Sequence, residues 1–517
     1  MSSSPFVKNT LILTIATLLS KILGSIFRIP LQNIAGDEVL GIFSLVYPVY
    51  MVALILSVAG IPVAISKLIA EARATGDSAQ VHIIYRTASI LAVLFGVVSF
   101  LLIFGLSPWI AEALGGAETR LALIVVAATL LIAPYMAVYR GFFQGFEDMG
   151  PTGISQVIEQ FVRVGLILVA AYYLVAIGAG TEVVAGGIMI GSVVGALISL
   201  IFLKVTYYRS GFRVASSGYR AADFWKWGKR ILVVSLPIAV GSITMALLNF
   251  VDSFTVPLGL REAGVRTGEV MYLYGIYGRG LALVQIATVF ASSIVLPLIP
   301  LMTKRLAEQD FAGTRRVIER TFRMTHLIGW PAAIGLFSLT LPLNLGLFTN
   351  LEGSVVLAVI GFSSVFTSLT LLGTGVLQGM DLAKFGAMII VGGVVLKIVL
   401  NILLIAAFGL EGAALATLLV YVVLFGVNCW AIYRKIKFTL ASVELLKMVM
   451  AAVVMGIVIG VPTLFIDVAA WSRGFALVYA VGGIFVGGLI YFGLLYLLRV
   501  VRREDLGRVP LLGRFVR

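Results

Sequence analysis

The chain has 517 residues, of which 60% are hydrophobic and 12% charged, and its 38 Lys and Arg against 24 Asp and Glu give a formal net charge of +14. A soluble fold cannot bury this much apolar surface, because ordinary soluble domains are about half apolar and about a quarter charged. The apolar runs are continuous over roughly 20 residues, which excludes a porin-like barrel with its alternating strands. The composition therefore predicts an all-α polytopic membrane protein with room for about fourteen spans.

Fourteen apolar segments long enough to cross a bilayer follow one another along the chain. We place them at 10–34, 40–66, 84–110, 120–143, 155–178, 182–206, 230–256, 272–302, 326–349, 353–379, 384–408, 411–433, 446–467 and 474–498. With Lys8 inside, the even number puts both termini in the cytoplasm. Of the 38 Lys and Arg residues, 29 fall on that side and four outside. This bias follows the positive-inside rule and argues against nucleic acid as the partner of the basic residues.

The second half of the chain repeats the first at an offset of 234 residues. The anchors are Gly141–Gly145 with Gly375–Gly379, Gly41–Phe43 with Gly275–Tyr277, and Arg163 with Lys397. Six spans in each copy keep the same orientation, so the repeat is parallel. It predicts a first six-helix lobe at 1–225, a second at 226–437, and helices 13 and 14 with a basic tail at 438–517. Such a bundle is typical of a transporter that works by alternating access.

Charged residues inside the predicted spans are mainly cations. They are Lys21, Arg28, Arg163, Arg279 and Lys397, against Glu159 and Asp252. Glu159 and Arg163 are four residues apart on a helix, so we expect them to form a structural pair. The remaining cations favour an anionic substrate, because burying charge in a membrane is costly.

The predicted depths of these cations form a column. Arg28 and Arg279 both lie roughly 10 Å below the outer surface. Lys21 is two turns from Arg28 on the same face, and Lys397 falls near the midplane. We expect Arg28 and Arg279 above all to bind a phosphate-bearing head group, with Lys21, Lys397 and Arg163 completing the cationic cavity. The alternative is that Arg28 and Arg279 reach the outer interface.

Asp252 is the carboxylate of the spans to which the sequence assigns no partner. It follows Asn249 by three residues on one face, and such oxygen ligands suit Na⁺ or a proton. We therefore treat Asp252 and Asn249 as the candidate site of a coupling ion. The alternative is a carboxylate near the outer end of the span that reaches water.

Catalytic and cofactor motifs are missing from the sequence. Cys429 is the one cysteine, His82 and His326 lie far apart near span ends as solvated caps, and Gly228-Lys-Arg230 lacks the glycine spacing and hydroxyl of a phosphate loop. We expect no catalytic residue, no metal and no cofactor beyond a coupling ion. An enzyme acting on prenyl phosphates would show clustered Asp or His, so we do not expect an enzyme.

Several motifs carry a family resemblance. Ser20–Gly24 with Arg28, Gly60–Lys67, and Tyr139–Gly145 followed by Met149–Thr152 and Ile154–Gln160 resemble the polysaccharide flippases of Gram-positive spore-formers. These are the stage V sporulation protein B-like and MurJ-like lipid II flippases of the multidrug/oligosaccharidyl-lipid/polysaccharide exporter superfamily. The resemblance implies a V-shaped pair of lobes around a cationic cavity, with helices 13 and 14 forming a groove for a polyprenyl tail. By it, Arg279 matches the cavity arginine, and Lys21 and Arg28 match the basic pair of the first span.

The resemblance further implies the function. The chain would move an undecaprenyl-pyrophosphate-linked cell-wall precursor, similar to lipid II, from the inner to the outer leaflet of the bacterial plasma membrane. The alternatives are a flippase for another lipid-linked polysaccharide (capsule, exopolysaccharide or spore cortex), a cation-coupled multidrug exporter, and a membrane scaffold. Expected partners are the lipid-linked glycan, membrane lipids and cell-wall synthesis proteins, with the chain itself a monomer in vegetative or sporulating cells.

Overall fold

The computed structural model describes residues 5–58, 60–211, 218–439 and 442–500. Within these ranges, side chains are described except at 5–12, 237, 240–242, 244–245, 267, 296–297 and 300. All regular structure in the described ranges is helical. The chain divides into two compact units, Met1–Gly278 with Lys397–Ala406, and Arg279–Leu396 with Ala407–Arg517. The prediction of an all-helical polytopic membrane protein is confirmed.

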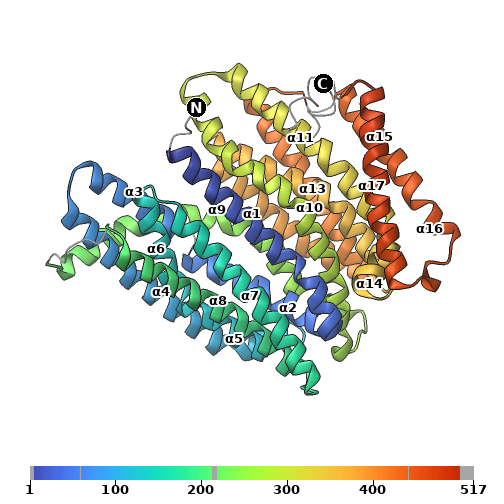
Figure 1. The fold of residues 1–517 in the computed structure, drawn as a ribbon, viewed down its shortest axis with the longest axis horizontal. Helices are drawn as coiled ribbons and strands as arrows, with labels where there is room; N and C mark the ends of the chain where they lie inside the picture. Colours follow the sequence, from blue (N-terminus) through green and yellow to red (C-terminus); the bar gives the residue numbers. More distant parts are fainter. Residues whose placement is uncertain (1–4, 59, 212–217, 440–441, 501–517) are drawn as a thin grey trace. The chain divides into compact units, whose positions relative to one another are not determined.

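The first unit consists of the helices up to the start of α10 and a short part of α14 (Figure 1). Its elements are α1 (Pro5–Ile26), α2 (Arg28–Val58), α3 (Ile61–Ala74), α4 (Ser78–Ala113), α5 (Thr119–Ala127), η1 (Ala128–Leu131), α6 (Ala133–Gly145), α7 (Gly150–Ala176), α8 (Thr181–Arg209) and α9 (Ala221–Glu262).

The second unit contains the remaining helices. They are most of α10 (Thr267–Ala307), α11 (Phe311–Ser338), α12 (Thr340–Phe348), α13 (Ser354–Gly379), most of α14 (Ala383–Lys435), α15 (Val443–Gly460), α16 (Pro462–Phe465), η2 (Val468–Ala470) and α17 (Arg473–Leu497).

Polar side chains at several helix starts accept the first free backbone N–H groups. Asp77, Asp310, Ser442 and Ser472 cap α4, α11, α15 and α17 in this way. The hydrogen bond from the Gly313 N–H holds the pKa of Asp310 below its usual value, and the Arg305 guanidinium acts in the same direction. These caps explain why each helix begins where the apolar pattern starts.

Two glycines break long helices in which pairs of predicted spans meet. Gly36, with φ 81°, lies inside α2, and Gly409, with φ 57°, lies inside α14. Both angles are in the left-handed region that favours glycine. Gly36 thus separates the predicted span 10–34 from the span 40–66. Gly409 separates the span 384–408 from the span 411–433.

Length and composition identify ten helical segments of the described residues that can cross a membrane. The count rises to eleven if the bent pair α11 and α12, which meet at 74°, is one span. The expected number was fourteen. Segments Leu13–Ala74 and Ala383–Lys435 each count once although a glycine divides them, and α9, which holds the predicted span 230–256, is not among the ten. The number fourteen therefore stays a prediction.

Small residues let α7 and α8 approach closely in the first unit. A Cβ placed on Gly191 would lie 2.7 Å from the carbonyl oxygen of Arg163, and one on Gly195 would lie 2.8 Å from that of Glu159. The two helices lie side by side along most of their length (Figure 1). Because α7 carries Glu159 and Arg163, this close packing fixes the backbone of both charged residues.

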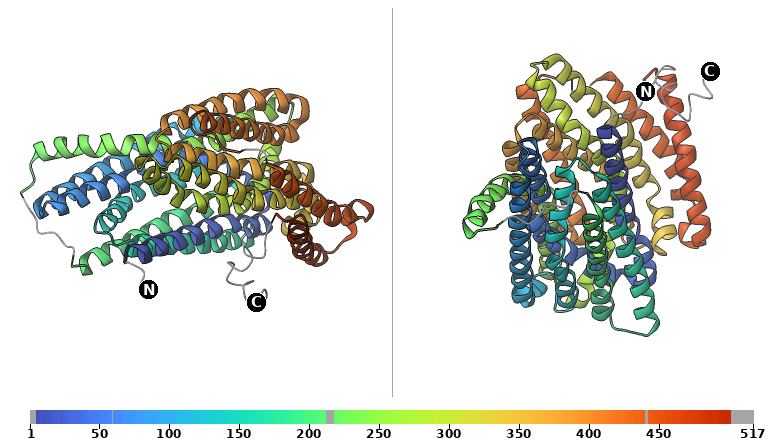
Figure 2. Two further views of the ribbon diagram at one scale, coloured as in Figure 1. Left: turned by 90° about the horizontal axis from the view of Figure 1, so that it is seen from above. Right: turned by 60° about the vertical axis from the view of Figure 1, so that its left-hand side comes forward.

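Helices α15 and α17 pack together in the second unit, as the red ribbons of Figure 2 show. A Cβ on Gly487 of α17 would lie 3.2 Å from the Met455 side chain of α15. The Tyr491 hydroxyl donates a hydrogen bond to the Leu327 carbonyl oxygen of α11 at 2.9 Å. These contacts hold α15 and α17 as a pair against α11.

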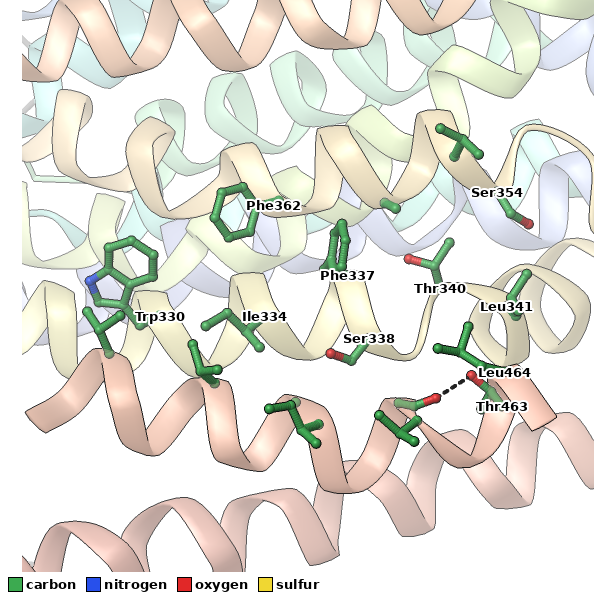
Figure 3. Close-up of a pocket in the computed structure, with 18 residues that line it drawn as sticks. Trp330, Ile334, Phe337, Ser338, Thr340, Leu341, Ser354, Phe362, Thr463 and Leu464 are labelled. Carbon is green, nitrogen blue, oxygen red and sulfur yellow. Dashed lines mark hydrogen bonds between the residues drawn. The ribbon is translucent and has the colours of Figure 1, made fainter. Parts of the chain in front are cut away.

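An apolar cleft of about 650 Å³ opens beside α15 in the second unit. Trp330, Ile334 and Phe337 of α11 and Phe362 of α13 line it together with α15 (Figure 3). Its few polar groups lie at the α12 and α16 end, where the Thr463 hydroxyl is already bonded to the Gly460 carbonyl oxygen at 2.7 Å. The wall therefore suits a hydrocarbon chain better than a polar ligand.

Candidate functional site

Arg163 lies on α7 and points toward α2 in the first unit. Its guanidinium donates hydrogen bonds to Gln160 Oε1 at 2.5 Å and to the Tyr47 hydroxyl at 3.3 Å. It also lies 5.9 Å from the centre of the Tyr47 ring. Its described hydrogen-bond acceptors are thus a neutral amide and a phenol. Arg163 retains its charge for a further ligand.

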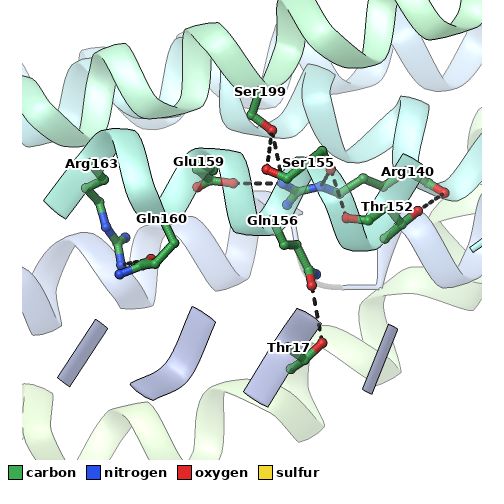
Figure 4. Close-up of polar contacts among 9 residues, drawn as sticks. All are labelled: Thr17, Arg140, Thr152, Ser155, Gln156, Glu159, Gln160, Arg163 and Ser199. Atoms are coloured by element: carbon green, nitrogen blue, oxygen red, sulfur yellow. Dashed lines mark hydrogen bonds and ion pairs between the residues drawn. The ribbon is translucent and has the colours of Figure 1, made fainter. Parts of the chain in front are cut away.

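The expected pair of Glu159 with Arg163 is wrong. Glu159 is paired with Arg140 of α6, whose Nη2 lies 2.8 Å from the carboxylate (Figure 4). Arg140 also donates to Ser155 Oγ at 3.1 Å and to Ser199 Oγ at 3.2 Å. Three acceptors fix the Arg140 fork, and Figure 4 shows Arg163 turned away from them toward Gln160. A partner brought in by another helix therefore prevails over the neighbour one turn away.

Arg28 lies at the start of α2 and is 5% exposed. Its guanidinium carbon is 5.5 Å from the centre of the Phe43 ring, a cation–π contact that does not neutralise the charge. Its Nε has no hydrogen-bond partner among the described residues. Arg28 interacts electrostatically with Arg163, Tyr47 and Tyr274. The first unit thus holds one buried and one half-buried arginine in one neighbourhood, and neither appears in a described ion pair.

Other buried donors of this neighbourhood also lack a partner among the described residues. These are Nε2 of Gln160 and the hydroxyl of Tyr274. Buried polar groups normally have a hydrogen-bond partner, and leaving one without a partner costs about 1–3 kcal/mol. An anion supplies acceptors that such donors require. Arg28, Arg163, Gln160 and Tyr274, together with Tyr47, form what we call the arginine site.

The structure places Lys21 differently from the other cations. It lies on α1 and its side chain is exposed. It is therefore not part of the buried arginine site in the described structure.

Asp252 is not the unpaired carboxylate that the sequence indicated. The Lys397 Nζ lies 3.2 Å from Oδ1, and both side chains are almost completely buried. Asp252 also accepts hydrogen bonds from the Tyr277 hydroxyl at 2.9 Å and from Asn401 Nδ2 at 2.8 Å. Asn249 is not among its described partners. The fold brings α9 and α14 together. The predicted cavity cation Lys397 and the predicted coupling carboxylate Asp252 therefore pair with each other.

The Asp252–Lys397 pair gives a stability prediction. We expect Asp252→Asn alone to destabilise the protein by about 3–5 kcal/mol, because it leaves an ammonium buried without its counter-charge. The double variant Asp252→Asn with Lys397→Met should recover much of that loss. The measurement is the fraction of purified protein that stays monodisperse on heating, compared across the four members of the cycle.

An exposed ion pair provides the matched control. Arg230 and Glu71 are joined at 2.6 Å in the same unit, with half-exposed side chains. Breaking this pair should cost less than about 1 kcal/mol. A loss in the double variant equal to the sum of the losses in the two single variants would show that Asp252 and Lys397 are not energetically coupled.

Arg279 is the first residue of the second unit and is fully buried. Its Nη1 donates to Asn344 Oδ1 at 3.0 Å and to Asn350 Oδ1 at 2.8 Å, and the group lies 5.4 Å from the Phe348 ring centre. Asn344 is itself held by Ser354 Oγ and the Glu352 carbonyl oxygen. Arg28 belongs to the first unit and Arg279 to the second, and their predicted common depth stays a prediction.

The sequence analysis missed several of these partners. Tyr47 lacked a sequence signal, because an aromatic residue near a span end is usually an interfacial anchor. Arg140 had one, since it is a charge inside the predicted span 120–143 and within the motif Tyr139–Gly145. Asn344 and Asn350 are polar residues around the end of another predicted span. Within the described residues, there is no group of three or more His, Cys, Asp or Glu that can hold a metal.

Long apolar helices define the class of this protein, an all-helical polytopic membrane protein. The chain belongs to the polysaccharide biosynthesis protein family, whose sequence profile matches residues 6–305. Several of its relatives and fold neighbours are transporters.

Curated relatives from Bacillus subtilis cover nearly the whole chain. The uncharacterised membrane protein YabM is 30% identical over 520 residues, covering 99% of this chain and 96% of YabM. Lipid II flippase MurJ is 26% identical, covering 93% of this chain and 91% of MurJ. Stage V sporulation protein B is 27% identical over the full length of both chains.

Solved structures agree on the fold. An inward closed conformation of lipid II flippase MurJ has a TM-score of 0.68 at 15% identity and covers 93% of this chain and 99% of that one. An inward-facing transporter of the multidrug resistance MATE family has a TM-score of 0.61 at 18% identity, covering 81% of this chain and 94% of that one. The fold is that of MurJ and MATE transporters.

Proposed function

We propose that the protein is a flippase that moves an undecaprenyl-pyrophosphate-linked cell-wall precursor, similar to lipid II, from the inner to the outer leaflet of the bacterial plasma membrane. The observation that carries the proposal is the arginine site, where the buried Arg28 and the half-buried Arg163 lie near each other without a carboxylate partner in the described ion pairs. Arginine's planar fork suits phosphate oxygens, and low water content strengthens each contact. The pyrophosphate binds there, and Arg279 is a separate candidate phosphate ligand within the second unit.

The charge pattern favours this substrate over a cationic drug. A cation exporter requires a carboxylate free to bind its substrate. Glu159 is held by Arg140, and Asp252 is held by Lys397. Glu159 and Asp252 therefore already have basic partners, whereas Arg28 and Arg163 of the first unit appear in no described ion pair. This supports an anionic head group.

The remaining parts of the proposal follow from the family and the repeat. Two six-helix lobes, 1–225 and 226–437, alternate in access, and the helices of 438–517 guide the polyprenyl tail. The apolar cleft beside α15 has the chemistry for a hydrocarbon chain (Figure 3). The coupling ion, a proton or Na⁺, acts at Asp252 in competition with the Lys397 ammonium, which already neutralises the carboxylate. The chain acts as a monomer alongside cell-wall synthesis proteins.

Complementation tests the proposed substrate. The chain should restore growth to bacteria depleted of their own lipid II flippase. Failure with verified membrane expression would contradict a lipid II-like substrate and favour another lipid-linked polysaccharide, the second candidate. That candidate rests on the family, whose name covers polysaccharide biosynthesis in general.

Orientation gives a separate prediction. We expect both termini in the cytoplasm, with Glu182 and Gly264 outside, since most Lys and Arg lie on the side of the termini. Cysteines introduced at Glu182 and Gly264 should react with a membrane-impermeant maleimide in intact cells. Cysteines at Ser2 and Arg517 should react only after the cells are lysed. Outside labelling at Arg517→Cys would reverse the topology.

A further inference from the structure

A second pocket, of about 480 Å³, lies beside the middle of α11 and the first turns of α15 in the second unit. Unlike the apolar cleft, its wall carries charged side chains, among them Glu319, Arg320, Arg323 and Glu444. We call it the polar pocket. The flippase proposal gives it no role.

The charges of the polar pocket leave one cation available. Glu319 accepts hydrogen bonds from Arg315 Nε at 2.9 Å and from the Thr439 N–H at 2.9 Å. Glu444 is paired with Arg323 at 3.1 Å. Arg320 is exposed and appears in no described ion pair. The pocket thus offers one guanidinium to a ligand with about one negative charge.

His326 adds a buried donor to the wall of the pocket. It is 6% exposed, so it is not the solvated cap expected from its position near a span end. The Trp330 Nε1 donates to its Nδ1 at 3.1 Å, so the neutral ring carries its proton on Nε2. That Nε2 has no hydrogen-bond partner among the described residues. Buried donors of this kind call for an acceptor.

The first turn of α15 faces the same pocket and favours negative charge. Ser442, Glu444 and Leu445 line the pocket, and Ser442 Oγ accepts the Leu445 N–H at 3.1 Å. The first N–H groups of an 18-residue helix carry a partial positive charge. Arg320, the His326 donor and this helix end therefore all favour an anion.

The polar pocket continues into the apolar cleft along the same two helices. On α11, His326 lines the pocket, and Trp330, one turn later and bonded to it, lines the cleft. On α15, Met448 lines the pocket and Val449 the cleft. The cleft extends from Val449 to Gly460, about 16 Å of helix. A polar pocket followed by an apolar cleft matches the two parts of an amphiphilic ligand.

We propose that the polar pocket and the apolar cleft form one site for a membrane phospholipid with a singly charged phosphodiester head group. The phosphate binds beside Arg320 and His326, and in the absence of substrate an acyl chain fills the cleft. The charges of the pocket's side chains decide which lipid binds. A pyrophosphate carries more negative charge than one available arginine balances. A zwitterionic lipid is disfavoured because the two carboxylates that would hold its amine are already paired. This site is independent of the arginine site.

Lipid retention by the purified full-length protein tests the proposal. Native mass spectrometry should show palmitoyl-oleoyl phosphatidylglycerol retained about tenfold better than the phosphatidylcholine with the same chains. Arg320→Gln should remove that preference. Arg316→Gln is the matched control, because Arg316 is exposed on the same helix and does not line the pocket, and it should keep the preference.

A second variant tests the cleft. Val453→Trp places a large side chain in the cleft and should lower retention of the long-chain phosphatidylglycerol while leaving the dihexanoyl form unaffected. Equal retention of the two head groups, or an equal effect of Arg320→Gln and Arg316→Gln, would overturn the site. Because no polyprenyl substrate is present, the result does not depend on whether the flippase proposal holds.

Discussion

Replacing Arg163 or Arg28 with alanine should reduce flipping of a lipid-linked pyrophosphate by about tenfold to a hundredfold. The folded protein should be present at parental levels. Each arginine supplies charge-assisted hydrogen bonds worth about 1.5–3 kcal/mol in a site with little water. Arg28 loses one cation–π contact with Phe43 and no described ion pair, so the substitution leaves the carboxylates of the unit undisturbed. The measurement is transport into the outer leaflet of proteoliposomes, with membrane insertion checked separately.

Lysine variants separate charge from shape. Arg28→Lys and Arg163→Lys keep the charge but lose the planar fork, and they should fall between parent and alanine variant. The control is Arg209→Ala, an exposed residue at the end of α8. A parental transport rate in both Arg28→Ala and Arg163→Ala would rule out the arginine site as the place of pyrophosphate binding. The same comparison at Arg279, where Asn344 and Asn350 are the described acceptors, tests the contribution of the second unit.

Replacing Arg140 with glutamine should impair transport about as strongly as a substitution at Arg163. Without Arg140, the Glu159 carboxylate loses its partner at 2.8 Å and can pair with Arg163 one turn away on α7. That pairing neutralises the charge that the substrate requires. Arg140 is therefore expected to act as a positioning residue that keeps Glu159 away from Arg163.

Glu159→Gln provides the rescue. Added to Arg140→Gln, it removes the competing carboxylate and should restore most of the transport, while Glu159→Gln alone should remain near the parental rate. A merely structural role for Arg140 predicts that loss and rescue follow the amount of folded, inserted protein, so transport is compared at equal amounts of inserted protein. An Arg140→Gln, Glu159→Gln protein that folds and inserts but transports no better than Arg140→Gln would refute the positioning role.

The sequence predicted the class of structure well. Apolar runs of about 20 residues predict membrane-spanning helices, because in a helix each backbone polar group finds a hydrogen-bond partner within its own segment. It also predicted most helices. The breaks at Gly36 and Gly409 fall between predicted spans, where a glycine supplies a positive φ. The described segments that satisfy length and composition nevertheless number ten or eleven, so the span count was less certain than the fold class.

Which charges pair with which was beyond the sequence. The rule for neighbours one turn apart assigned Glu159 to Arg163, whereas the structure gives it Arg140, 19 residues away. Asp252 was left unpaired, although Lys397 meets it from 145 residues further along the chain in the same unit. Sequence spacing on one helix is informative for exposed pairs of modest energy, but a buried carboxylate takes the partner that removes most of its desolvation cost.

The sequence by itself determined that this protein is a helical membrane protein with an excess of basic residues in its spans, because hydrophobicity and charge are properties that each segment carries alone. Tertiary structure decided which of those basic residues remain available to a ligand. Arg140 and Lys397 are used by carboxylates on other helices, while Arg28 and Arg163 have a phenyl ring, a phenol and an amide as their described neighbours. The physical reason is that neutralisation of a buried charge depends on atoms within about 4 Å, and helices distant in sequence bring those atoms together.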